Sequence, residues 1–406
     1  MNNKQQILEG SNAIAQVIKN IKPAVISAYP ITPQTHIVED LAKFKADGQA
    51  DYEYVRAESE FAAASIVLGA SATGVRSYSA TSSQGLLLMA EVIYNIAGMR
   101  LPIVMTCANR AISAPINIWN DQQDVMAVRD AGWILLFAEN HQEAVNQHIM
   151  AFKIAEKLKL PVMVNVDGFI MTHTYEPVII PTTEQIKKYL PDYKPANGQY
   201  LDTTNPATLG ALATPAHYME IRQELHEDLV ASLKTIEKEY KLFNRIIPSL
   251  KITKSKIKNL ESILNDTNDN GLLEYIGPKN PDIILIAMGS VIGTIKETVG
   301  NCPPYKGGIK GGLGILKIKC FRPFPTDEIL KIIKSAKNIA VIDKSISLGA
   351  IGTLASEIKT IAQGKINANI SSFIVGLGGR DITKEIIKKI IKQANKKSDK
   401  AIFVGK

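Results

Sequence analysis

The 406-residue chain is 46% apolar and 21% charged, which is enough for two packed cores and excludes a disulfide-stapled miniprotein or a disordered tail. Its net charge of +8 comes from the end of the chain, because residues 1–300 hold 27 basic and 32 acidic residues whereas residues 301–406 hold 20 and 7. Only two of those 20 basic residues are arginines and they are not interleaved with aromatic residues, so we expect a lysine-rich solvated surface and no nucleic-acid partner.

Cysteine usage and hydropathy narrow the class of protein further. The three cysteines, Cys107, Cys302 and Cys320, form no CxxC pair, which excludes a self-contained iron–sulfur cluster or zinc knuckle. The longest apolar runs, such as residues 283–288, are far shorter than the roughly 20 residues of a membrane span. The first residues carry no export signal, so we expect a cytoplasmic protein without a membrane partner.

Residues 23–168 alternate short β-type runs with amphipathic helical stretches, which is typical of an α/β domain with a mainly parallel sheet and helices on both faces. The predicted strands cover residues 24–29, 52–55, 75–80, 102–109, 132–138 and 161–167. Thr32, followed by Pro33, is one expected helix cap, and one residue of 81–83 is another. These caps place the strand-to-helix loops at one sheet edge, where open α/β sheets bind ligands.

The rest of the chain predicts two further parts. Residues 169–216 are rich in Pro, Thr, Asn and Tyr, so we expect an irregular extension of a first domain that covers residues 1–216. Residues 217–264 are helical and strongly charged and predict a helical linker. Strand and helix patterns then alternate again from Pro281 onward, which predicts a second, smaller α/β domain over residues 265–406.

Familiar catalytic and phosphate-binding motifs are absent from the sequence. The GGLGILK segment (311–317) lacks the third glycine of a dinucleotide fingerprint, and GLGGRD (376–381) has the wrong spacing, so its glycines predict a tight strand-to-helix turn. The six histidines form no HExxH pair and no serine lies in a GxSxG segment. An NAD-dependent dehydrogenase, a metal hydrolase and an esterase are therefore disfavoured.

Several segments instead agree, in order and spacing, with one family. They include AYPITPQT (28–35), RAESEFAAASIVLGA (56–70), YSATSSQGLLLM (78–89), CANRAISAPINIWNDQQD (107–124), RDAGWI (129–134), DGFIMTHTYEPV (167–178), FRPFP (321–325) and VGLGGRDIT (375–383). With these motifs the chain resembles the α subunits of pyruvate:ferredoxin oxidoreductases, within the 2-oxoacid:ferredoxin oxidoreductase family.

The resemblance implies a thiamine-diphosphate-binding fold of the pyrimidine type, followed by a domain similar to the transketolase C-terminal domain. In this family the cofactor lies between a domain that holds its aminopyrimidine and one that holds its diphosphate through Mg²⁺ and a GDG motif. This sequence has no Gly-Asp dipeptide, so the diphosphate half is expected on a separate β subunit. The implied partners are β, γ and ferredoxin-like δ subunits, with the iron–sulfur clusters on the β and δ subunits, and ferredoxin as electron acceptor.

Three site residues follow from matching this sequence to the family motifs. Glu60 matches the glutamate that bonds N1′ of the aminopyrimidine and so favours the tautomer whose 4′ nitrogen takes the proton from C2. Arg110 matches the arginine that holds the substrate carboxylate, and Thr32 matches a threonine beside it. Each also has a plain structural interpretation: Glu60 as a first-turn acid, Arg110 as a surface arginine and Thr32 as the helix cap. No role is assigned to the other polar residues of the same loop, Asn109, Asn117, Asn120 and Asp124.

The implied reaction is the oxidative decarboxylation of pyruvate with CoA to acetyl-CoA and CO₂, with electrons passed to ferredoxin. Related enzymes that act on 2-oxoisovalerate or other branched-chain 2-oxoacids share nearly all these motifs, so they remain an alternative. A non-catalytic scaffold subunit is a second alternative, which the joint presence of Thr32, Glu60 and Arg110 disfavours.

Overall fold

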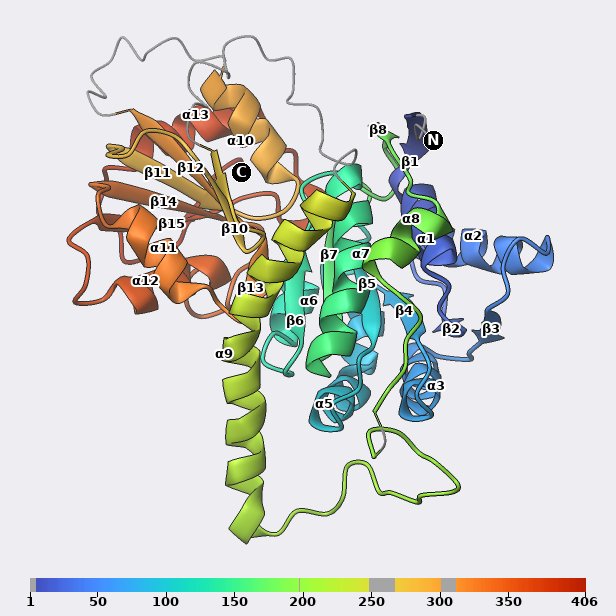
Figure 1. The fold of residues 1–406 in the computed structure, drawn as a ribbon. Helices are drawn as coiled ribbons and strands as arrows, with labels where there is room; N and C mark the ends of the chain where they lie inside the picture. Colours follow the sequence, from blue (N-terminus) through green and yellow to red (C-terminus); the bar gives the residue numbers. More distant parts are fainter. Residues whose placement is uncertain (1–4, 197, 248–266, 301–311) are drawn as a thin grey trace.

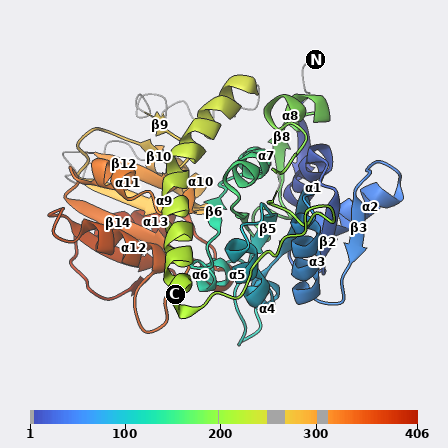
Figure 2. The same cartoon turned by 60° about the horizontal axis from the view of Figure 1, so that its bottom comes forward.

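The computed structural model describes residues 5–196, 198–247, 267–300 and 312–406. These residues form two seven-stranded sheets and a separate two-stranded sheet. In Figure 1 the two large sheets stand side by side, and the long helix α9 (Pro215–Ile246) runs along their boundary, as Figure 2 shows from a second direction. No helix in these four ranges is long and apolar enough to cross a membrane.

The first sheet contains the six predicted strands, each within two residues of its predicted bounds. They are β2 (Val25–Ala28), β3 (Glu53–Arg56), β4 (Ser77–Thr81), β5 (Val104–Asn109), β6 (Ile134–Phe137) and β7 (Val162–Asp167). These six strands pair in parallel, in the order β6-β7-β5-β4-β2-β3. The predicted α/β class with a mainly parallel sheet is confirmed.

Helices cover both faces of this sheet, because a parallel sheet buries both of its faces. The helices are α1 (Gly10–Ile21), α2 (Thr35–Ala46), α3 (Glu60–Ala72), α4 (Ser83–Leu88), α5 (Ala90–Gly98), α6 (Gln123–Ala127) and α7 (His141–Leu158). Apolar side chains of α1, α2 and α7 share one core with Val104 and Ala108 of β5. Those of α3, α4 and α5 share the opposite core with Met105 and Cys107 of the same strand, as the two-residue period of a strand requires.

The start of α2 differs from the prediction. Thr32 is not the helix cap: α2 begins at Thr35, after Gln34, and residues 31–34 form a turn in which the Gln34 amide donates to the carbonyl oxygen of Ile31 at 2.8 Å. Ser82 does occupy the cap position of α4, but its hydroxyl donates to the carbonyl oxygen of Ala108 at 2.6 Å instead of capping the helix. In both places contacts between loops override the local capping pattern.

Residues 169–216 are more regular than predicted. They contain β8 (Tyr175–Val178) and α8 (Thr183–Tyr189), and α8 begins with a capping box formed by Thr182 and Gln185. Strand β8 pairs antiparallel with β1 (Gln6–Glu9) at the beginning of the described chain. This pairing joins segments far apart in the sequence, so no local alternation pattern marks it.

Helix α9 covers the first part of the predicted linker, and the rest of it, residues 248–264, lies outside the described residues. Leu225, Ile236 and Phe243 of α9 pack into the same core as α1 and α7. The ring of Phe243 lies edge-on to that of Tyr189, with 5.3 Å between ring centroids. From Leu225 onward the described part of the linker is therefore packed against the first α/β unit, whereas most residues of 217–224 are exposed.

The second sheet has the order β16-β15-β14-β11-β12-β10-β9. Its strands are β9 (Thr267–Asp269), β10 (Leu273–Ile276), β11 (Ile283–Ala287), β12 (Leu313–Ile318), β14 (Asn338–Asp343), β15 (Asn369–Ile374) and β16 (Ile402–Phe403). Its helices are α10 (Val291–Gly300), α11 (Thr326–Ile333), α12 (Thr353–Ala362) and α13 (Lys384–Gln393). The second α/β unit is thus present, and it includes two antiparallel strands, β9 and β10, before Pro281, where the predicted alternation of strands and helices begins.

Residues 313–321 form one continuous β-type sequence pattern, but the structure divides them between the two sheets. β12 belongs to the second sheet, whereas β13 (Cys320–Arg322) pairs antiparallel with β6 at the edge of the first. Phe321 of β13 packs against Phe137 of β6, with 6.3 Å between ring centroids. One apolar core therefore runs continuously from the first sheet into the second.

Candidate functional site

The loops that follow β2, β4 and β5 meet at the carboxyl-end edge of the first sheet, where the sequence predicts a ligand site. The Gln34 side chain donates to the carbonyl oxygen of Ala80 at 2.6 Å. The hydroxyl of Ser83 donates to the carbonyl oxygen of Ala111 at 2.5 Å. These buried contacts join three loops into one hydrogen-bonded unit.

Arg110 lies directly after β5 and is only 9% exposed. Its Nη1 donates to the carbonyl oxygen of Thr32 at 2.8 Å, and its Nε donates to the carbonyl oxygen of Asn117 at 3.1 Å. The structure therefore brings Arg110 and Thr32 together, although Thr32 supplies a backbone oxygen to this contact and its side chain is exposed. Burial lowers the pKa of Arg110, and the nearby Asp124 carboxylate opposes that shift. Three of the five guanidinium hydrogens remain for a ligand.

Asp124 is the buried anchor of this loop. Its Oδ2 accepts the backbone amides of Arg110 at 2.9 Å and of Ser83 at 3.0 Å. Its Oδ1 accepts the side-chain amide of Asn109 at 3.0 Å. Burial nevertheless raises the pKa of Asp124 to about 6, because the hydrogen bonds only partly offset the loss of water around the carboxylate. Asp124 thus fixes the backbone that carries Arg110, a role that the sequence did not assign.

Glu60 is the first residue of α3, after Ser59, whose hydroxyl caps the helix by accepting the Ala62 amide at 3.2 Å. Its side chain is 7% exposed and lies against α4: a Cβ atom at Gly85 would come within 2.6 Å of Glu60 Oε1. Among the described residues no group forms a hydrogen bond or ion pair with this carboxyl group. The buried hydroxyl of Thr81, next to Gly85, also has no hydrogen-bond partner there. Glu60 is therefore a buried carboxyl group with its acceptor atoms unused.

A second group of residues, which sequence reasoning missed, joins the edge of β7 to the second sheet. The Asp167 carboxylate at the end of β7 accepts the Lys344 ammonium at 2.9 Å, the Ser290 amide at 2.8 Å and the Gln122 side chain at 3.1 Å. Burial acts to raise the pKa of Asp167, but Lys344 and Ser290 hold it below its usual range. In the sequence only the DGF segment that begins at Asp167 pointed to this group, because Ser290 and Lys344 lie far along the chain from Asp167.

The glycines of residues 376–379 form the predicted tight turn and also contact the Arg110 loop. All three have a positive φ, between 62° and 81°. The Gly379 amide donates to the carbonyl oxygen of Asn120 at 2.6 Å, and a Cβ at Gly379 would lie 2.2 Å from Cβ of Trp119. Glycine is therefore required both by backbone conformation and by close approach. The second α/β unit in this way supports the loop that follows β5.

These residues fit one half of a thiamine diphosphate site. The carboxyl group of Glu60 and the orphan hydroxyl of Thr81 are hydrogen-bonding groups suited to an aminopyrimidine ring, and only a glycine at position 85 lets the two approach the α4 backbone this closely.

Comparison with known proteins agrees with this geometry. Residues 16–241 match the family model described as "Pyruvate flavodoxin/ferredoxin oxidoreductase, thiamine diP-bdg". Residues 281–387 match "Pyruvate:ferredoxin oxidoreductase core domain II". The chain belongs to the pyruvate flavodoxin/ferredoxin oxidoreductase family. The predicted family and the thiamine-diphosphate-binding fold are thereby confirmed.

Relatives within this family match almost the whole chain. The chain is 45% identical to the pyruvate synthase subunit PorA of Methanocaldococcus jannaschii, over 98% of this chain and 97% of that protein. It is 43% identical to PorA of Methanosarcina barkeri, over 99% of this chain and 95% of that protein. It is also 39% identical to the ketoisovalerate oxidoreductase subunit VorA of Pyrococcus abyssi, over 97% of this chain and 94% of that protein.

A solved structure has the same fold at low sequence identity. It is the 2-oxoglutarate:ferredoxin oxidoreductase from Magnetococcus marinus, with 2-oxoglutarate, coenzyme A and succinyl-CoA bound, at a TM-score of 0.67 and 19% identity. The match covers 96% of this chain, which spans 65% of the chain in that structure. Further parts of that larger chain have no counterpart in the match.

Proposed function

We propose that this chain is the α subunit of a pyruvate:ferredoxin oxidoreductase of the pyruvate synthase type. The complex oxidatively decarboxylates pyruvate with CoA to acetyl-CoA and CO₂ and passes the electrons to ferredoxin. One observation carries this proposal. Two buried side chains, the Glu60 carboxyl group without a partner among the described residues and the Arg110 guanidinium, both lie at the carboxyl-end edge of the first sheet, in a domain whose family binds thiamine diphosphate.

Glu60 would hold N1′ of the aminopyrimidine and exchange a proton with it. Carbanion formation at C2 and decarboxylation of the 2-oxoacid are the chemistry that bound thiamine diphosphate supplies. The low exposure of Glu60 strengthens this proton-sharing hydrogen bond, because little water competes for the carboxyl group. Thr81 Oγ1 would serve the same ring, because it has no hydrogen-bond partner among the described residues and lies, like Glu60 Oε1, beside Gly85.

Arg110 would bind the substrate carboxylate with the hydrogens that Thr32 and Asn117 leave unused. Two hydrogen bonds to backbone carbonyls fix the guanidinium plane before substrate arrives, so less conformational entropy is lost on binding. A planar guanidinium holds a carboxylate through two parallel hydrogen bonds and so orients the 2-oxo group. In this proposal the exposed side chain of Thr32 would lie beside the same substrate carboxylate.

The remaining parts of the enzyme belong to partner subunits in this proposal. A β subunit would hold the diphosphate through Mg²⁺, and the β and ferredoxin-like δ subunits would carry the iron–sulfur clusters, with a γ subunit completing the complex in the cytoplasm. The similar PorA and VorA proteins are both named as subunits, which supports dependence on partners. Within this chain we propose residues 1–216 as the pyrimidine domain, 217–264 as linker and 265–406 as the second domain.

A 2-oxoisovalerate:ferredoxin oxidoreductase is the second candidate, favoured by the 39% identity to VorA over nearly the full length. Both candidates use the same Glu60 and Arg110 chemistry and differ in the side chains that surround the substrate's alkyl group.

Purification of the native complex, followed by assays on a 2-oxoacid series, tests the proposal. We expect partner subunits, bound thiamine diphosphate and iron–sulfur clusters to copurify, and ferredoxin reduction to depend on CoA and to prefer pyruvate. Preference for 2-oxoisovalerate would favour the second candidate. Absence of activity on every 2-oxoacid would favour the non-catalytic scaffold subunit. Calorimetry of the isolated chain with the cofactor and Mg²⁺ is the companion test: micromolar or tighter binding by this chain alone would contradict the divided site.

A further inference from the structure

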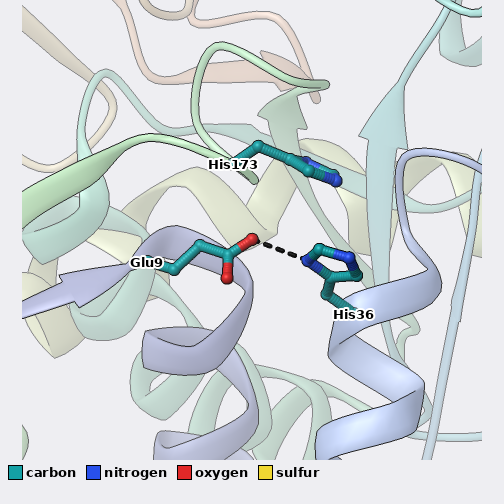
Figure 3. Close-up of side chains that lie close together, drawn as sticks. All are labelled: Glu9, His36 and His173. Carbon is teal, nitrogen blue, oxygen red and sulfur yellow. Dashed lines mark hydrogen bonds and ion pairs between the residues drawn. The ribbon is translucent and has the colours of Figure 1, made fainter.

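Glu9, His36 and His173 lie together near the start of α2, in a group that the proposed reaction does not use. Glu9 ends β1, His36 lies in the first turn of α2, and His173 precedes β8. One potential ligand atom from each side chain lies within 4.8 Å of the other two. Figure 3 shows the three side chains reaching from three separate segments toward a common point.

We propose that Glu9, His36 and His173 form a binding site for one divalent transition-metal ion of the Zn²⁺ class. Two imidazoles and one carboxylate are a ligand set that zinc uses with a fourth position left for water or another ligand. Imidazole ligands select Zn²⁺, Cu²⁺, Ni²⁺ or Fe²⁺ over the oxygen-preferring Ca²⁺ and Mg²⁺.

The geometry of the group is close to what a metal requires. His36 Nδ1 lies 2.7 Å from Glu9 Oε1, and the ring centroids of His36 and His173 are 4.5 Å apart. Tetrahedral zinc bonds of about 2.0–2.1 Å place ligand atoms roughly 3.3 Å apart. The His36 side chain is 46% exposed, so its rotation can open the hydrogen bond to Glu9 and close the gap to His173 without moving the core.

The surroundings orient the least mobile ligand. The hydroxyl of Thr172 lies 2.7 Å from Nδ1 of His173 and also accepts the Phe169 amide at 2.8 Å. The Phe169 ring packs on His173, with 4.7 Å between centroids, and on Trp119, with 4.5 Å between centroids. A polar partner on one ring nitrogen is the usual support of a metal-bound histidine.

A metal here would tie together three segments that border the proposed substrate site. His36 is in α2, the helix that follows the turn at Thr32. The Phe169 ring packs on both His173 and Trp119, and Trp119 lies in the loop after β5 that also contains Arg110. The ion would therefore act as a positioning element for these loops rather than as a participant in the reaction.

Zinc titration of the untagged full chain tests the site, with Co²⁺ as a spectroscopic probe. We expect one Zn²⁺ per chain, a visible Co²⁺ absorption band typical of four or five ligands, and a rise in Tm with added metal. The variants Glu9→Gln, His36→Gln and His173→Gln should each weaken binding at least tenfold. His226→Gln, on the exposed surface of α9, is the matched control and should bind as the unmodified chain does.

Because His36 is exposed, its replacement leaves folding intact and makes a failure to bind interpretable. The proposal is overturned if the unmodified chain takes up no stoichiometric Zn²⁺, or if His36→Gln and His173→Gln bind it as tightly as His226→Gln. These measurements need neither thiamine diphosphate nor turnover, so they are independent of the proposed reaction.

Discussion

The side chains of Glu60, Glu139 and Glu143 are all largely buried, but in the part of the chain that the structure describes only the latter two have cations beside them. Lys317 Nζ lies 2.7 Å from Glu139 Oε2 and 2.8 Å from Glu143 Oε2. Lys319 Nζ lies 3.1 Å from Glu143 Oε1. Glu60, in contrast, forms no ion pair with any described residue, and its Oε1 lies beside Gly85.

The paired group joins the two sheets. Glu139 and Glu143 lie at the start of α7 beside the first sheet, whereas Lys317 belongs to β12 in the second. Burial acts to raise the pKa of Glu143, but the two lysines overcome it and hold that pKa well below its usual range. These ion pairs hold the two sheets together. The uncompensated carboxyl group of Glu60 is instead the arrangement expected where a ligand supplies the missing partner.

The sharpest test of this comparison is Glu60→Gln in the assembled complex. The amide keeps the shape of the side chain but cannot share the N1′ proton, so hydrogen–deuterium exchange at C2 of thiamine diphosphate should slow by about 10²–10⁴-fold. The Tm should change little, because the carboxyl group has no partner among the described residues. Glu58→Gln, two residues earlier and exposed, is the matched control. Unchanged exchange in Glu60→Gln would reduce Glu60 to a first-turn acid.

Removing a cation from the paired group should have the opposite signature. Lys317→Met leaves Glu139 and Glu143 buried beside less positive charge, so we expect about 3–5 kcal/mol lower free energy of unfolding. Lys337→Met breaks an exposed pair with Asp282, whose lysine is 78% exposed, and should cost under about 1 kcal/mol. Denaturant unfolding of the two variants separates these outcomes.

The same group sets a pH dependence at its acidic end. A depressed Glu143 pKa stabilises the fold above the unfolded value of about 4.3, and this contribution is lost as pH falls below it. The advantage of the unmodified chain over Lys317→Met should therefore shrink in acid. A difference that is constant from neutral pH to pH 3 would argue against charge compensation.

Asp124 is expected to show the reverse pH dependence. Its pKa is about 6 in the folded chain against about 3.9 when unfolded, so the folded state binds the extra proton and loses stability as pH rises from about 4 to about 6. That loss amounts to up to about 3 kcal/mol and should be absent in Asp124→Asn. Stability measured across this interval, with the exposed Asp399→Asn as control, checks it. Identical slopes in all three proteins would refute the raised pKa.

The smallest effect is expected at Arg110. Arg110→Lys keeps the charge but loses the planar two-point contact, so kcat/KM for pyruvate should fall by about 10–100-fold. A rise in KM alone would indicate simple substrate binding, and a fall in kcat would indicate alignment of the carbonyl. Arg222→Lys on α9 serves as control. If Arg110→Ala kept the kcat/KM of the unmodified enzyme for every 2-oxoacid, another cation would have to bind the substrate carboxylate.

The six strands of the first sheet could be predicted because their apolar patterns are local, and the sheet edge that carries the site followed from their order. The sequence also placed Arg110 directly after β5, at that edge. The roles of Glu60, Arg110 and Thr32 came from motif resemblance and stay predictions. The expected cap at Thr32 was wrong, since α2 begins only at Thr35 and the preceding Gln34 side chain binds the carbonyl oxygen of Ala80 in β4.

Only the tertiary structure decided which distant groups meet. The chain leaves the second sheet after β12 and adds β13 to the first, although residues 313–321 form one continuous β-type pattern. Asp167 and Lys344 are 177 residues apart, and neither carries a local signal of its partner. Sequence patterns report the burial period of a segment, whereas its neighbours depend on how whole sheets pack. The same physical reason explains why Glu60 can be recognised as acidic from the sequence, but as unpaired only from the fold.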